Sequence, residues 1–153
     1  LYEIVYEAQE KSIQAALVGT SFRSLFELSY AIVADGLLRL GIIKDVSEAR
    51  SYYPHGLSHH IGLDVHDPGN YVDLAPNMVV TIEPGIYIPE GSPCDSKWWN
   101  IGIRIEDDIL ITEKGPLNLS AGAPRKWEEI ELMMKQESVL DDFILPEIET
   151  LIQ

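Results

Sequence analysis

The chain has 153 residues, 46% of them hydrophobic and 24% charged, which is the balance of a globular domain with a single core. Lys and Arg number 11 against 25 Asp and Glu, and the net charge of −14 would repel a phosphate backbone or an anionic lipid surface. We therefore expect neither nucleic acid nor membrane as a partner. The lone Cys94 excludes an internal disulfide and a multi-cysteine zinc site, and it fits a reducing, cytoplasmic location.

Two helices are predicted at the start of the chain. Apolar residues recur at helical spacing over residues 1–18, and Gly19 ends this first helix. Ser21 can cap a second helix over about residues 22–40, which Gly41 ends. Since the break between them is short, we expect an antiparallel pair.

Loops and short strands are predicted after Pro54. Residues 78–82 and 86–88 are apolar and β-branched, whereas residues 101–112 alternate, with isoleucines on one face and charged residues on the other. The segment 89–100 is predicted to be an exposed loop that carries Cys94 and two tryptophans. The pattern indicates an α+β fold in which helices cover a largely antiparallel sheet.

The C-terminal part is predicted to contain one further helix after Pro124, with Trp127, Ile130 and Met134 on its inner stripe. Residues 138–153 form an acidic tail in which a short helix could follow Pro146. We therefore divide the chain into a domain over residues 1–137 and a tail over residues 138–153.

A histidine cluster is the strongest chemical signal in the sequence. All four histidines fall within the twelve positions 55–66, namely His55, His59, His60 and His66, with Asp64 among them and Asp67 directly after them. Imidazole is a common metal ligand and carries protons near neutral pH, so the cluster points to a metal site, acid–base chemistry or both.

Two carboxylates complete the candidate set. Glu83 closes an apolar strand, where burying its charge is costly unless a positive partner meets it. Arg104 and Glu106 share one face of the strand over residues 101–112. The alternatives without a metal are that Glu83 simply points to solvent, and that Arg104 and Glu106 form an exposed ion pair that contributes little to stability. One imidazole with two carboxylates suits zinc, manganese or cobalt better than calcium.

Three strings in this sequence identify a family resemblance: HGLSHHIGLDVHD, TIEPGIYI and GIRIEDDILIT. They resemble the pita-bread metallopeptidases, and among these the Xaa-Pro aminopeptidases, from the helix pair through Glu131. His60 departs from the pattern, because relatives more often carry a bulky aromatic residue there. The resemblance implies that the chain is part of a pita-bread catalytic domain.

The resemblance also implies two divalent metal ions, manganese first, with zinc and cobalt as alternatives. His59 and Glu83 would bind one ion, and Glu106 would bridge both. Two aspartate ligands would come from strands that precede the helix pair, so this chain looks like an internal piece of a longer protein, inactive by itself. The remaining carboxylates would then raise each other's pKa.

Catalytic roles follow from the same resemblance. Glu83 would shuttle protons, and Arg104 would bind substrate or orient Glu106. His55 and His66 would help to move protons and hold the substrate.

The implied reaction removes an N-terminal residue that precedes proline, with a proline-containing peptide as substrate and a homo-oligomer as the expected assembly. A prolidase, which cleaves Xaa-Pro dipeptides, is the alternative within the family, although Ser58 and the short loop after Ile88 favour an aminopeptidase. A catalytically inactive pita-bread module that binds peptides is the alternative from another class.

Overall fold

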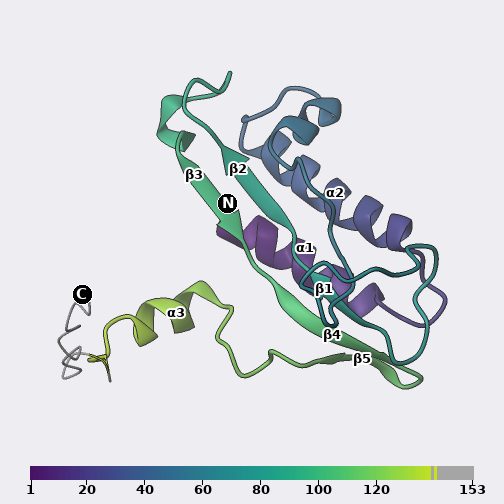
Figure 1. The fold of residues 1–153 in the computed structure, drawn as a ribbon. Coiled ribbons are helices and arrows are strands. Elements are labelled where there is room, and N and C mark those ends of the chain that lie inside the picture. Colours follow the sequence, from purple (N-terminus) through teal and green to yellow (C-terminus); the bar gives the residue numbers. More distant parts are fainter. Residues whose placement is uncertain (139, 141–153) are drawn as a thin grey trace, which may run out of the picture. The chain divides into compact units, whose positions relative to one another are not determined.

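The computed structural model describes residues 1–138 and 140. The chain divides into two compact units, residues 1–123 and residues 124–153. The first unit combines a pair of helices with two antiparallel sheets, as expected for an α+β fold (Figure 1). No helix in the described part of the chain is long and apolar enough to cross a membrane.

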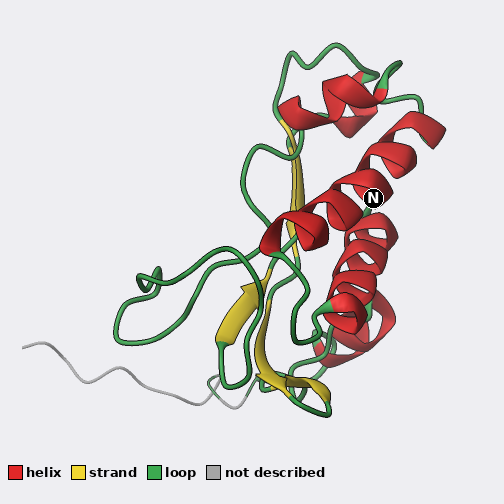
Figure 2. Cartoon of the chain, turned by 90° about the vertical axis from the view of Figure 1, so that its right-hand side faces the viewer, coloured by secondary structure: helices red, strands yellow, loops and turns green. Residues whose placement is uncertain are grey.

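The helix pair begins the first unit (Figure 2). Helix α1 spans Tyr2–Ala15 and helix α2 spans Phe22–Arg39. The predicted cap of α2 is confirmed, because the Ser21 hydroxyl accepts a hydrogen bond from the Ser24 N–H at 3.0 Å. Gly41 follows α2 with φ +67°, a left-handed conformation that ends the helix at little cost for glycine.

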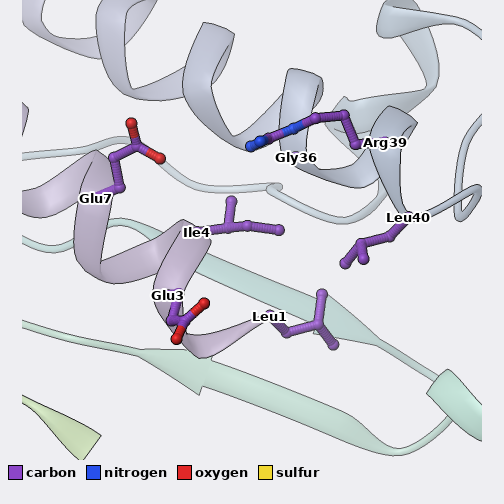
Figure 3. Close-up of a pocket in the computed structure, with 7 residues that line it drawn as sticks. All are labelled: Leu1, Glu3, Ile4, Glu7, Gly36, Arg39 and Leu40. Carbon is purple, nitrogen blue, oxygen red and sulfur yellow. The ribbon is translucent and has the colours of Figure 1, made fainter.

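A glycine allows the two helices to approach closely. A Cβ atom at Gly36 of α2 would lie 2.6 Å from side-chain atoms of Ile4 on α1. Beside this contact lies a cavity of about 280 Å³, shown in Figure 3. It is lined by residues of the two helices and their ends: Leu1, Glu3, Ile4, Glu7, Gly36, Arg39 and Leu40. None of the predicted site residues is among them, so this cavity is separate from the candidate chemistry.

Five strands form the two sheets. Strands β1 (Val79–Ile82), β4 (Asp107–Thr112) and β5 (Gly115–Asn118) form one sheet, in the order β1-β4-β5. Strands β2 (Gly85–Ile88) and β3 (Ile101–Arg104) form the other. The predicted single strand over residues 101–112 is therefore two strands, and β5 was not predicted.

The two sheets share one register. Ile82 pairs with Asp107 at the end of the first ladder, and Gly85 pairs with Arg104 at the start of the second. No residue is gained or lost between these pairs, so Glu83 falls opposite Glu106. The ladder is interrupted next to Glu83 because Pro84 has no N–H to donate.

The predicted isoleucine face is confirmed as the core face at Ile105, Ile109 and Ile111, whereas Ile101 and Ile103 are half-buried. The core face is formed by alternate residues of the strands, all of them at most 6% exposed: Val80, Ile82, Ile86, Ile88, Ile105, Ile109 and Ile111. One polar residue shares this face. Asp107 is 2% exposed and accepts a hydrogen bond from the Ser120 hydroxyl at 2.6 Å.

Two short 3-10 helices, Val46–Ser51 and Ser96–Trp98, lie in the connections. The second belongs to the loop between β2 and β3, which was expected to be exposed. Cys94, Trp98 and Trp99 in this loop are instead half-buried and pack against the core, so that expectation was wrong for these three side chains.

The second unit contains helix α3, Trp127–Met133. None of its residues is fully buried. The predicted inner stripe is wrong for Trp127 and Met134, which are 40% and 77% exposed, whereas Ile130 is half-buried. The predicted short helix after Pro146, and all but two residues of the proposed tail, lie outside the part of the chain that the structure describes.

We expect Gly36→Ala to destabilise the fold, although alanine is the better helix former by about 1 kcal/mol. The added methyl group would overlap Ile4, and overpacking costs about 1–3 kcal/mol, so the net loss should lower the melting temperature by about 2–4 °C. Thermal unfolding followed by circular dichroism measures this shift. Ile4→Ala combined with Gly36→Ala should lose less than the sum of the two single variants, and strict additivity would contradict the contact.

Candidate metal centre

Backbone pairing brings a third segment beside the two strands that carry the carboxylates. Residues 57–61 run antiparallel to β1, on the edge opposite β4. The N–H groups of Thr81 and Glu83 donate to the carbonyls of His59 and Leu57, both at 2.9 Å. Because residues that lie opposite each other share a face, His59 is on the same face as Glu83 and Glu106.

The structure thus brings the three predicted ligands together. One ligand atom each from His59, Glu83 and Glu106 lies within 4.8 Å of the others. Ligand atoms bound to one ion at about 2.1 Å can be at most about 4.2 Å apart, so these side chains would need to close in by only a few tenths of an ångström. The donor set of one imidazole and two carboxylates therefore fits a divalent cation of the zinc or manganese type.

The two carboxylates face each other across the ladder. Like charges directly opposite in a sheet are destabilising. Partial burial and the neighbouring charge of Glu83 raise the pKa of Glu106, whereas His59 and Arg104 act in the opposite direction. The expected rise in a carboxyl pKa is therefore confirmed in direction. A cation between the two groups would offset this repulsion, which is a second observation in favour of a metal site.

Hydrogen bonds fix the orientation of His59 and Glu83. His59 Nδ1 lies 2.9 Å from the His60 carbonyl, which can only accept, so Nδ1 carries the hydrogen. Nε2 then faces Glu83 Oε1 at 3.2 Å, and both side chains are nearly buried. The Thr81 hydroxyl accepts from the His59 N–H at 3.0 Å and donates to Glu83 Oε1 at 3.3 Å. The nitrogen suited to a metal therefore points at the carboxylate.

Arg104 holds the other oxygen of Glu83. Its Nη1 lies 3.4 Å from Glu83 Oε2, and its side chain is 45% exposed. Its Nε donates to the Tyr87 hydroxyl at 2.6 Å, and this bond is the largest contribution to the raised pKa of Arg104. The carboxylate that Arg104 orients in this structure is Glu83.

Tyr87 is a member of the cluster that sequence reasoning missed. Its hydroxyl accepts from Arg104 and lies 3.0 Å from His55 Nε2. Because His55 Nδ1 faces the Gly56 carbonyl at 2.6 Å, Nε2 is the acceptor and Tyr87 the donor. The period-two pattern from Glu83 through Gly85 to Tyr87 could have found it, because it places all three residues on one face.

The remaining histidines differ in their surroundings. His66 lies in an exposed loop, with its ring centroid 4.4 Å from that of His59 and nearly perpendicular to it. His60 is 9% exposed and packs against Phe22 and Tyr71 at ring distances of 5.3 and 4.9 Å. The structure thus places His66 beside the predicted ligand His59, links His55 through Tyr87 to Arg104, and gives His60 a packing role.

We expect Glu106→Gln to stabilise the metal-free protein slightly at neutral pH, because one of two facing negative charges is removed. The gain should be about 0.5 kcal/mol, since Glu106 is exposed and water screens the repulsion. The affinity for Mn²⁺ should fall by more than about tenfold. A loss of that size follows even when the residue removed only hydrogen-bonds a metal ligand, and Glu106 is a predicted ligand itself.

The stability gain should depend on pH. The raised pKa means that Glu106 keeps its proton to higher pH in the folded protein than in the unfolded chain. The repulsion, and with it the stability gain of the variant, is therefore present above this pKa. Both are absent at low pH, where Glu106 is protonated in the folded and the unfolded state. Melting curves at pH 4 and pH 7.5 in a chelator, with a Mn²⁺ titration, measure both effects. Glu113→Gln, in the exposed turn after β4, is the control, and unchanged Mn²⁺ affinity in Glu106→Gln would contradict this assignment.

Known proteins match both the sequence and the arrangement of the first unit. The model of metallopeptidase family M24 matches residues 1–113. Human Xaa-Pro aminopeptidase 3 is 39% identical over 148 residues, which cover 90% of this chain and 29% of the relative. Xaa-Pro aminopeptidase of E. coli is 44% identical, over 88% of this chain and 33% of the relative. The chain thus spans about a third of the length of these relatives.

Solved structures of E. coli aminopeptidase P, one of them zinc-substituted and in complex with product, superpose with a TM-score of 0.83 at 44% identity. The superposed region covers 87% of this chain and 33% of the solved chain. Three others carry single histidine-to-alanine substitutions separated by four and seven positions, the spacing of His55, His59 and His66 here. The described α+β arrangement is therefore part of the pita-bread fold, and the chain belongs to metallopeptidase family M24.

Proposed function

We propose that the protein that contains this chain is a metal-dependent aminopeptidase that removes the N-terminal residue of peptides with proline in second position. The observation that carries the proposal is the pair of facing carboxylates, Glu83 and Glu106, with His59 Nε2 directed at the same point. The names and the extent of the matched relatives support it. Since those relatives are about three times longer, the proposal concerns the whole protein.

Divalent cations held by His59, Glu83 and Glu106 would polarise the scissile carbonyl and lower the pKa of water. Glu83 is held by two partners: Thr81 donates a hydrogen bond to one of its oxygens, and Arg104 Nη1 forms an ion pair with the other at 3.4 Å. In the proposed reaction, Glu83 takes a proton from the attacking water and delivers it to the proline nitrogen, which leaves as an amine.

The chain from Arg104 through Tyr87 to His55 would position the substrate. The rings of Tyr87 and His55 meet edge to face, at an angle of 66° with centroids 5.4 Å apart, beside the carboxylates. Such ring surfaces suit a pyrrolidine, which offers apolar carbons and no N–H. His66, whose ring meets that of His59 edge to face from an exposed loop, would contact the substrate from the other side.

The finer parts of the proposal concern metal identity, assembly and completeness of the site. We propose manganese as the working metal and a homo-oligomer as the assembly. The resemblance implies five protein ligands, of which these residues supply three, so we propose that the 153 residues alone do not hydrolyse peptides. A cation held only by His59, Glu83 and Glu106 lacks the second ion with which it would share the charge that develops in the transition state.

The substrate class can be tested on the metal-loaded whole protein with an Xaa-Pro-Xaa tripeptide and an Xaa-Pro dipeptide. We expect Mn²⁺-dependent release of the first residue from the tripeptide. Glu83→Gln should lower kcat by on the order of 10³-fold, the value of a lost proton carrier, while Glu90→Gln, in the exposed loop after β2, leaves kcat unchanged. Turnover of the dipeptide alone would show a prolidase, and metal binding without hydrolysis would show a peptide-binding module.

The role of the missing ligands is tested by comparing the 153 residues alone with the whole protein, both in excess Mn²⁺. We expect hydrolysis by the whole protein and none above background by the 153 residues. Equal turnover would show that three ligands suffice.

A further inference from the structure

Arg50, in the last turn of the first 3-10 helix, uses its charge differently from other arginines of this acidic chain. Within the described residues it forms no ion pair with a carboxylate, whereas three other arginines do. Its Nη1 instead lies 3.4 Å from two backbone carbonyls, those of Tyr53 and His55. Because Nη1 carries two hydrogens, it can donate to both carbonyls at once.

The two carbonyls lie on either side of Pro54, in the stretch of backbone that carries His55. The sheet holds this stretch at its ends, because the carbonyls of Tyr52 and Leu57 accept hydrogen bonds from N–H groups within residues 83–87. Pro54 has no N–H with which to hold the middle. Arg50 therefore supplies the contacts that fix the course of the backbone between the two ends.

The ring contacts of His55 depend on this backbone. Nδ1 donates to the Gly56 carbonyl at 2.6 Å, and Nε2 accepts from the Tyr87 hydroxyl at 3.0 Å. The ring of Tyr53 meets that of His55 edge to face, with centroids 5.1 Å apart. A shift of the carbonyls that Arg50 holds would change these contacts, and with them the link from His55 through Tyr87 to the candidate site.

Helix α2 anchors the arrangement from outside the site. The guanidinium carbon of Arg50 lies 5.6 Å from the ring centroid of Phe26, and the hydroxyl of the fully buried Tyr53 lies 3.2 Å from that of Ser29. Phe26 and Ser29 both belong to α2. A planar guanidinium suits the face of an aromatic ring better than a compact ammonium does. The helix thus fixes Arg50 and Tyr53, and these two residues fix His55.

We propose that Arg50 is a positioning residue, which sets the orientation of His55 in the candidate site without contacting the substrate itself. This inference rests on the proposed function, because Arg50 acts through His55. Loss of the guanidinium would release the carbonyls of Tyr53 and His55 and leave the three predicted metal ligands in place. A misplacement of about 1 Å in an active site can cost about 100-fold in rate, so the penalty is measurable.

Kinetics of the metal-loaded whole protein on the Xaa-Pro-Xaa tripeptide test this role. We expect Arg50→Met to lower kcat/KM by about tenfold, within the range of such misplacements. Arg50→Lys should retain part of the activity, and the Mn²⁺ affinity should not change in either variant. The control is Arg23→Met, which removes an exposed arginine of α2 that pairs with Glu27 and should keep the parent kcat/KM.

A double-mutant cycle separates positioning from general support of the fold. In the His55→Ala background, Arg50→Met should cause little further loss of kcat/KM, because the side chain that Arg50 positions is absent. An arginine that only supports the fold would cost the same factor in both backgrounds, and that result would contradict the inference.

Chemical rescue tests the guanidinium itself. Arg50 lines an open hollow of about 410 Å³ with Phe26, Tyr30 and Gly56, so a small cation from solution can reach its place. In Arg50→Ala, added ethylguanidinium should restore part of kcat/KM, whereas ethylammonium should restore less. Equal effects of the two cations would contradict a role for the planar group.

The ring signal of His55 judges the inference without requiring hydrolysis. In the metal-free whole protein with ¹³C-labelled histidines, this signal is assigned by its loss in His55→Ala. It should shift in Arg50→Met and keep its position in Arg23→Met, and an unshifted signal in Arg50→Met would overturn the inference. The tripeptide assay judges the proposed function separately. If the parent protein does not hydrolyse the tripeptide, the proposed function fails, and a shifted His55 signal still supports the positioning role.

Discussion

The candidate site depends on one electrostatic constraint: Glu83, 8% exposed at the end of β1, faces the second carboxylate of Glu106 across the ladder. A buried carboxylate is tolerated only with hydrogen bonds and positive partners. Thr81 provides the hydrogen bond and Arg104 the positive charge. His59 Nε2 faces the same carboxylate with a lone pair, so this contact and the repulsion from Glu106 remain for a bound cation to offset.

Local patterns in the sequence were sufficient for the parts of this arrangement that lie within one element. Period-two alternation placed Arg104 and Glu106 on the face opposite the isoleucines, and the cap at Ser21 and the glycine after α2 marked the ends of that helix. These features depend on neighbours in the chain, so they can be read from short windows.

Features that depend on pairing between distant segments were not predictable in this way. The alignment of residues 57–61 with β1 is set by hydrogen bonds between residues 18 to 26 positions apart, and it decides that His59 joins the carboxylates. Tyr87 is a different case: the local period-two pattern places it on the face of Glu83, but an aromatic residue in an apolar strand is most often core, and it was missed for that reason. The half-burial of Trp98 and Trp99 depends on where the hairpin folds back, which no local pattern indicates.

The shared register of the two ladders also has a consequence for how this protein can change over evolutionary time. Glu83 and Glu106 face each other between the paired residues Ile82–Asp107 and Gly85–Arg104. The loop between β2 and β3 lies beyond these pairs, at the far end of the hairpin. Insertions or deletions in that loop therefore do not change which residues of the strands are paired. The length of that loop could therefore change without shifting Glu83 against Glu106, provided that the loop still covers the part of the core on which Cys94, Trp98 and Trp99 pack.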